Sequence, residues 1–232
     1  PLPPGRRSRP ARESCAVDVG GGFVFLAAGL VLAPVADQLA TNAPIGAPLQ
    51  RRAGLSRAFP LVALGTAGFG AACGLAFGLG LEGLAAAMLC WLLVILTRTD
   101  LEHRLLPDRI VLPGTVLLLG LRTLDDPSLE WVASALGAGL VLFLIVLVYP
   151  KGMGMGDVKL AALLGAGLGA HVAIALFLGF FAAFVPALAL LLRHGGAARR
   201  QAIPLGPFLA LGALLALFFG AEIWDWYTSL GV

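Results

Sequence analysis

Long stretches without a charged side chain are the feature that most limits what this chain can fold into. Long runs that lack Asp, Glu, Lys and Arg include residues 19–36, 60–81, 131–150 and 160–192. A helix crosses the hydrocarbon core of a bilayer with about 20 apolar residues. Charged residues make up only 12% of the chain, whereas soluble domains carry about 25%. We therefore predict an all-α, polytopic membrane protein.

Further charge-free runs lie at residues 83–97, 110–121 and 201–221, and each predicts another helix that crosses the membrane. The run 160–192 is too long for one crossing, and its glycines predict a hairpin: Gly165, Gly167 and Gly169. The run 110–121 is short for a spanning helix and needs flanking leucines to reach across the membrane. The pattern as a whole predicts about eight transmembrane helices.

The chain divides into three parts by composition. Residues 1–18 form a basic N-terminal tail, residues 19–59 hold the first span and a reduced cytoplasmic loop, and residues 60–232 form one membrane-embedded domain. The loop, residues 37–59, is rich in Pro, Ala and Arg and has no strong hydrophobic period. We expect it to have little core of its own.

The basic residues predict which way the chain lies in the membrane. Cytoplasmic loops carry an excess of Lys and Arg, and with the N-terminus outside most basic residues fall on one face. They are Arg51, Arg52, Arg57, Arg98, Arg104, Arg109, Lys151, Lys159, Arg193, Arg199 and Arg200. The arginines of the N-terminal tail are the exception, because they fall on the opposite face.

Cysteine content excludes several classes of site. The cysteines Cys15, Cys73 and Cys90 form no CxxC pair, so they predict neither a disulfide framework nor a thiolate zinc site. The net charge is only +3. We expect no metal, no other cofactor and no nucleic-acid partner, and the lipid bilayer is the partner that the composition implies.

Two aspartates are candidates for chemistry. Asp100 ends the third predicted span and Asp157 begins the sixth, so both fall at the cytoplasmic face. Helix ends at one face can be neighbours, and two close carboxylates share a proton because both cannot ionise cheaply. The ionised carboxylate can take a proton from water while the neutral one donates to a peptide carbonyl. This is the chemistry of aspartic proteolysis, and it needs neither metal nor cofactor.

Both aspartates also have a structural interpretation. Asp157 follows a glycine and precedes an apolar run, which favours a helix N-cap. Asp100 fits an interfacial residue paired with Arg98 or Arg104, because charged residues at the ends of spans are normal. These alternatives stay open on composition and position alone.

The residues around the aspartates have their own interpretations. Gly154 and Gly156 let the backbone bend and approach another chain closely, which a substrate lying against the segment would need. Lys159 is placed to neutralise the aspartate pair or to meet lipid head groups. Asp108 follows Pro107 and is interpreted as the N-cap of the fourth span.

Three segments together resemble a known family. Asp100-Leu-Glu-His-Arg-Leu-Leu-Pro-Asp108 resembles the first-aspartate motif of type IV prepilin peptidases. Gly154-Met-Gly-Asp-Val-Lys-Leu160 matches the GxGD motif of their wider class, and Ile203-Pro-Leu-Gly-Pro-Phe-Leu-Ala-Leu-Gly212 is similar to the segment before their last helix. The resemblance covers roughly residues 59–220.

The resemblance implies a membrane aspartic endopeptidase of the bacterial cytoplasmic membrane. Such enzymes remove the short basic leader from prepilin or pseudopilin precursors at the cytoplasmic face. The matching motifs imply Asp100 and Asp157 as the catalytic pair. They imply supporting roles for Gly154, Gly156, Lys159 and Pro107.

The N-terminal part departs from the family pattern. Many members carry paired CxxC motifs between their first two spans and also N-methylate the trimmed pilin, but residues 37–59 contain no cysteine. Phe59-Pro-Leu-Val-Ala63 is similar to the family's "yPlvE" segment, with alanine in place of the usual glutamate. Without a cysteine this loop cannot bind zinc through thiolates. The sequence therefore argues against methyl transfer.

Two other functions are compatible with the residues. A small multipass transporter would use the aspartates as a proton or ion site, although transporter sites lie near the midplane and this chain shows no half-to-half symmetry. An assembly platform without chemistry would need neither aspartate for pilin processing.

Overall fold

The structure, a computed structural model, describes residues 18–42, 59–150, 153–194 and 204–229. The described residues form eight α-helices and one short 3-10 helix, with no strand among them. In chain order they are α1 (Val19–Asn42), α2 (Phe59–Phe77), α3 (Leu81–His103), α4 (Asp108–Asp125), α5 (Glu130–Val148), α6 (Met155–Leu168), η2 (Gly169–His171), α7 (Val172–His194) and α8 (Gly206–Ser229). The predicted all-α architecture is confirmed.

Six helical stretches within the described residues are long and apolar enough to cross a membrane. One of them, Met155–Arg193, runs through α6, η2 and α7. The helix α4 is not among the six, and this agrees with the short apolar run predicted there. By length and composition α1, α2, α3, α5 and α8 each qualify alone, while α6 and α7 qualify as one stretch of 39 residues, so the six candidates are roughly consistent with the prediction of about eight transmembrane helices.

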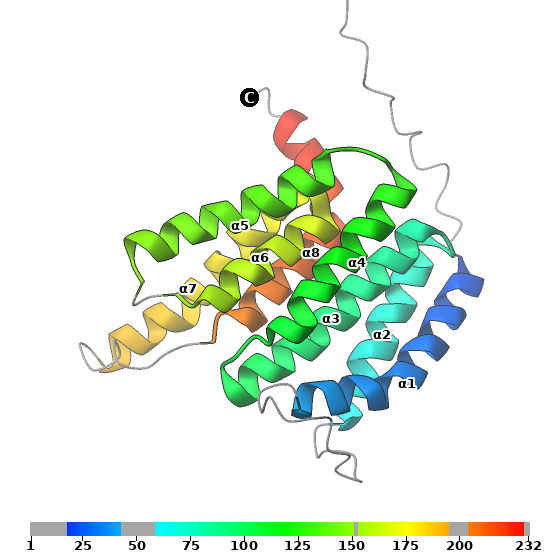
Figure 1. Ribbon diagram of the computed structural model, residues 1–232, viewed down its shortest axis with the longest axis horizontal. Coiled ribbons are helices and arrows are strands. Elements are labelled where there is room, and N and C mark those ends of the chain that lie inside the picture. The colour runs from blue at the N-terminus through cyan, green and yellow to red at the C-terminus, as the bar shows by residue number, and fades with distance from the viewer. Residues whose placement is uncertain (1–17, 43–58, 151–152, 195–203, 230–232) are drawn as a thin grey trace, which may run out of the picture.

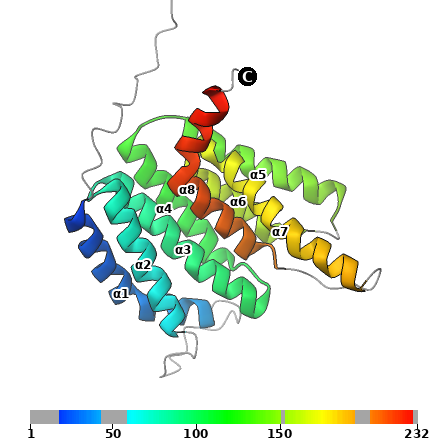
Figure 2. The same cartoon turned by 180° about the vertical axis from the view of Figure 1, so that it is seen from behind.

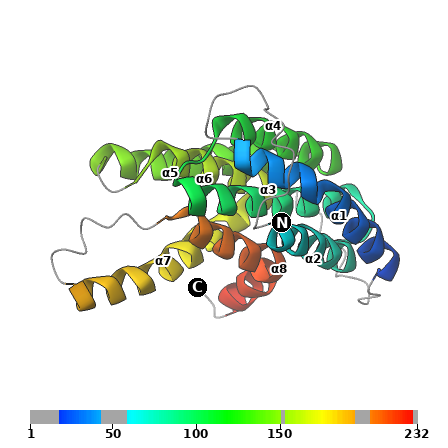
Figure 3. The ribbon, with the colours of Figure 1, turned by 90° about the horizontal axis from the view of Figure 1, so that it is seen from below.

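The helix α3 lies at the centre of the bundle and contacts α1, α2, α4, α6 and α8. Figure 1 shows α1 and α2 at one side of α3 and the group α5 to α8 at the other. Seen from below, α4 and α5 lie on the opposite side of the molecule from α7 and α8 (Figure 3). The residues of α3 are consequently buried along most of the helix.

Small residues let the helices approach closely, as in other membrane bundles. A Cβ atom at Gly165 of α6 would stand 2.4 Å from the carbonyl oxygen of Ser134 in α5. A Cβ atom at Gly212 of α8 would stand 2.2 Å from the carbonyl oxygen of Ala175 in α7. Only glycine allows these two helix pairs to pack at their present distance.

The structure corrects two boundaries. The helix α1 continues through Asn42, so Asp37 is a buried helical residue and not part of a cytoplasmic loop. The break between α6 and α7 falls at Gly169, whose φ of +59° suits glycine, whereas Gly165 and Gly167 lie inside α6. The remainder of the predicted loop, residues 43–58, lies outside the described residues.

Candidate active site

Asp100 lies in the last turn of α3, in the interior of the protein. Arg104 follows this helix in the left-handed conformation, with φ of 53°, and its N–H donates to the carbonyl oxygen of Asp100 at 2.8 Å. The chain can then turn back into α4. Only 6% of the surface of Asp100 is exposed, so its carboxylate is largely withdrawn from bulk water.

The first residue of α8 holds the carboxylate of Asp100. The N–H of Gly206 donates to Oδ2 of Asp100 at 2.9 Å. The first N–H groups of a helix have no partner within the helix, and the helix dipole favours an anion at this end. A Cβ atom at position 206 would stand 2.6 Å from the same oxygen, so the contact requires glycine.

Asp157 lies in the first turn of α6. The N-cap of α6 is Gly154, so Asp157 is the third helical residue and not the N-cap that its position suggested. Its Oδ2 accepts the N–H of Gly154 at 3.3 Å. Asp157 is half-buried, in contrast to Asp100.

The structure brings both aspartates to the same end of the bundle. Asp100 lies in the last turn of α3 and Asp157 in the first turn of α6, and these two helices are in contact. Asp100 is deeply buried and Asp157 is half-buried. Two carboxylates in unequal surroundings are the side chains that general acid and base catalysis at a peptide bond uses.

The other predicted motif residues pack this end of the bundle together. A Cβ atom at Gly156 would stand 3.1 Å from Cβ of Leu106, so the start of α6 lies against the connection between α3 and α4. Nζ of Lys159 donates to Oδ2 of Asp108 at 2.6 Å, and it therefore links α6 to α4. Asp108 is the first residue of α4 and Pro107 is its N-cap, which corrects the N-cap predicted for Asp108.

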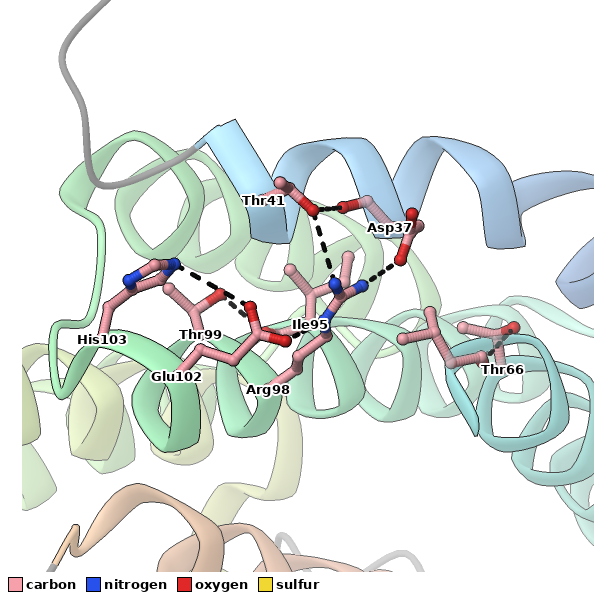
Figure 4. A network of polar contacts seen from close by, with 9 residues as sticks. Asp37, Thr41, Thr66, Ile95, Arg98, Thr99, Glu102 and His103 are labelled. Carbon is pink, nitrogen blue, oxygen red and sulfur yellow. Dashed lines mark hydrogen bonds and ion pairs between the residues drawn. The ribbon is translucent and has the colours of Figure 1, made fainter. Parts of the chain in front are cut away.

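Sequence reasoning missed a polar cluster built on the residues two positions before and after Asp100, which Figure 4 shows in detail. Arg98 of α3 forms an ion pair with Asp37 of α1. Its Nε donates to Oε1 of Glu102 at 3.0 Å, and Nη2 donates to Oγ1 of Thr41 at 3.4 Å. Arg98 is thus a buried residue that ties α1 to α3, and not a residue of a basic loop.

One of the missed residues left a signal in the sequence and the other did not. Asp37 follows a charge-free run directly, and an acidic residue next to a membrane segment is expensive unless it has a partner. Gly206 lies within the motif Ile203–Gly212, but its contact joins residues more than 100 positions apart in the chain. Such a contact has no signature in a single sequence.

Among the residues that the structure describes, no group of three or more His, Cys, Asp or Glu side chains could hold a metal ion. The side chains described at the candidate site are the two carboxylates and the groups that hold them.

Comparison with known proteins places these residues in a family. The model of the type IV leader peptidase family matches residues 87–192, a range that contains both Asp100 and Asp157. No solved structure gives a significant match to the chain.

Three relatives share the name prepilin leader peptidase/N-methyltransferase. The chain is 35% identical over 183 residues to the protein of Bacillus subtilis, covering 77% of this chain and 73% of the relative. It is 38% identical over 191 residues to that of Aeromonas hydrophila and 35% identical over 189 residues to that of Pseudomonas aeruginosa. Each of these two matches covers 77% of this chain and 64% of the relative. The chain belongs to the type IV leader peptidase family.

Proposed function

We propose that this protein is a membrane aspartic endopeptidase that removes the leader peptide from prepilin or pseudopilin precursors. The observation that carries the proposal is that Asp100 and Asp157 lie at the same end of the bundle, at the ends of α3 and α6, which are in contact. The relatives are named for prepilin leader cleavage, and the site contains the side chains which that reaction needs.

The reaction proceeds as general acid and base catalysis by the two carboxylates. The ionised carboxylate takes a proton from a water molecule, whose oxygen adds to the carbonyl carbon of the scissile bond. The protonated carboxylate donates its proton to the carbonyl oxygen. The tetrahedral intermediate then collapses, the C–N bond breaks, and the leaving amine takes a proton from the site.

The membrane location suits a precursor whose apolar segment already lies in the bilayer. The bilayer confines enzyme and substrate to one layer and holds the scissile bond at the depth of the carboxylates. The basic residues gathered at this end support a location at the cytoplasmic face by the rule for Lys and Arg. Among the described residues these include Arg104, Arg109 and Lys159.

The N-methyltransferase activity in the names of the relatives is not included in this proposal. Residues 37–59 contain no cysteine, so a thiolate zinc site cannot form in that loop. Mass spectrometry of the mature N-terminus of a processed pilin tests this point, and a monomethylated product would contradict it.

Co-expression with a prepilin tests the peptidase activity directly. Leader removal is followed as a gel shift of the precursor, comparing wild type with Asp100→Asn and Asp157→Asn. Each substitution keeps the size of the side chain but removes its ability to ionise, so we expect processing to be abolished. Asp225→Asn, an exposed aspartate in the last turns of α8, is the matched control and is expected to process normally.

Processing that survives both substitutions at the site would refute the assignment. A transporter that used the aspartates as a proton site would leave the precursor uncut in the wild type as well. An assembly platform would give the same result, so the wild-type lane separates the peptidase from both other functions.

A further inference from the structure

A cavity lies beside the candidate active site, between α2, α3 and α8, with a volume of about 430 Å³. The helix α3 contacts both neighbours and lies between them when the molecule is seen from behind (Figure 2). Ligand pockets have volumes of about 300–1,000 Å³. The cavity therefore has room for a few side chains but not for a complete helix.

The walls of the cavity adjoin the residues that hold the buried carboxylate. Leu101 lines the cavity and directly follows Asp100. Pro207 lines it from α8 and directly follows Gly206, whose N–H donates to Asp100. Each of these two lining residues is thus the chain neighbour of a residue at the candidate catalytic site, so the cavity adjoins that site.

The cavity is apolar along most of its length and polar at one end. Leu61 on α2 is 72% exposed and Leu211 on α8 is 48% exposed, and both line the cavity, so it opens toward the lipid-facing surface. Thr97, Arg98 and Glu102 line it close to the C-terminal end of α3. Glu102 accepts from Nε of Arg98 at 3.0 Å, and its Oε2 lies 3.8 Å from Nε2 of His103. This end therefore presents both hydrogen-bond donors and acceptors.

This distribution of polarity matches one kind of occupant. A peptide that emerges from the bilayer near Asp100 has apolar side chains inside the membrane and a polar, basic part outside it. The apolar walls suit the first part, and the polar end formed by Thr97, Arg98 and Glu102 suits the polar groups of the second. A lipid acyl chain would fill the apolar walls but would not use the proximity to Asp100.

We propose that this cavity binds the apolar side chains that follow the scissile bond of the precursor, and that it selects for bulky ones. The inference rests on the proposed function, because it assigns a specificity site to the same reaction. The cavity distinguishes precursors by how tightly it binds their side chains, and it takes no part in breaking the peptide bond. Changing the cavity therefore alters which precursors are cut, while the two carboxylates remain intact.

Filling the cavity from α2 gives a direct test. Gly65 lines the cavity, and a Cβ atom there would stand 3.3 Å from Cγ2 of Val94. Gly65→Leu therefore extends a side chain into the cavity space. Gly68 lies on the same helix with no atom within 4 Å of its Cβ position, so Gly68→Leu is the matched control. Ala210→Leu fills the same cavity from α8 and serves as a second variant if Gly65→Leu fails to fold.

The full-length protein is assayed with two prepilin precursors that differ only in the residues after the cleavage site, which are leucines in one and alanines in the other. We expect Gly65→Leu and Ala210→Leu to lower kcat/KM for the leucine precursor roughly tenfold or more, the usual scale for a hydrophobic pocket. The alanine precursor should be cut at nearly the wild-type rate, and Gly68→Leu should leave both rates unchanged.

Equal loss on both precursors, or no change on either, would overturn the inference. A further outcome, read by native mass spectrometry, is that the cavity-filling variants lose a co-purifying lipid while the ratio of the two cleavage rates stays unchanged. That result would overturn the inference and assign the cavity to a lipid acyl chain. Failure of the wild type to cut either precursor would instead refute the proposed function. So would cleavage that survives Asp100→Asn and Asp157→Asn.

Discussion

Gly206 has a role that depends on a single missing methyl group. Its N–H holds Oδ2 of Asp100, and a Cβ atom would stand 2.6 Å from that oxygen. The carboxylate of Asp100 cannot move away freely, because the residue is almost fully buried. The orientation of one catalytic group is thus set by a residue from a different helix.

Gly206→Ala is therefore expected to displace the carboxylate of Asp100. A displacement of about 1 Å in an active site can cost about 100-fold in rate, and we expect a loss of leader cleavage on that scale. Gly120→Ala in α4 is the control, since no atom lies within 4 Å of its Cβ position. Cleavage rates and thermal unfolding of both variants in detergent give the comparison. Near-normal cleavage by Gly206→Ala would show that the contact does not position Asp100.

The ion pair between Asp37 and Arg98 predicts a large effect on stability. Asp37 is 1% exposed, and removing one partner of a buried ion pair costs about 3–5 kcal/mol. We expect Asp37→Ala to lower the free energy of unfolding by an amount in this range. The double variant Asp37→Leu/Arg98→Met should recover much of the loss, because an apolar replacement of the pair leaves no buried charge. Thermal or denaturant unfolding measures both, and a loss no smaller in the double variant would contradict this account.

At the level of helices, three helices build the candidate site, and each contributes one residue from one of its ends. The helix α3 brings Asp100 in its last turn, α6 brings Asp157 in its first turn, and α8 brings Gly206 as its first residue. Their packing depends on close approach between helices, which glycine permits. Distortion of one helix pair would therefore move a catalytic group without changing any residue of the site.

Gly165→Ala tests how tightly α5 and α6 are packed. The added methyl group would stand 2.4 Å from the carbonyl oxygen of Ser134, and overpacking of this kind costs typically 1–3 kcal/mol. Gly137→Ala in α5, where the Cβ position is open, should instead be neutral or stabilising, because alanine favours a helix by about 1 kcal/mol over glycine. Thermal unfolding distinguishes the two variants, and equal stability would show that the helices can move apart at little cost.

At the level of the whole molecule, the sequence indicated the helices well because each one is a run of apolar residues with polar ends. It also predicted that Asp100 and Asp157 fall on the same side of the membrane, and the helices that carry them, α3 and α6, are in contact. Partners that lie on different helices were not visible. Asp37 was assigned to a loop because its burial depends on Arg98, which lies 61 positions along the chain. Apolar periodicity carries no information about such a pair.

The orientation of the whole molecule can be checked with single cysteines. Leu105 is exposed next to the candidate site, and Ser229 is exposed at the far end of α8. In cells that carry Cys15→Ser, we expect a membrane-impermeant thiol reagent to label Ser229→Cys directly. Leu105→Cys should react only after the membrane is permeabilised. The natural Cys73 and Cys90 are buried and serve as internal negatives. The reverse labelling pattern would invert the proposed topology.

The contact between Gly206 and Asp100 also bears on which shortened chains can keep the candidate site. The family match ends at residue 192, before α8 begins, and yet α8 supplies both the N–H that holds one carboxylate and a wall of the adjoining cavity. A gene that ended after α7 would still encode both aspartates and the GxGD motif. Its product would match the family and lack a complete candidate site, so α8 belongs to the unit that must be inherited together with the motifs.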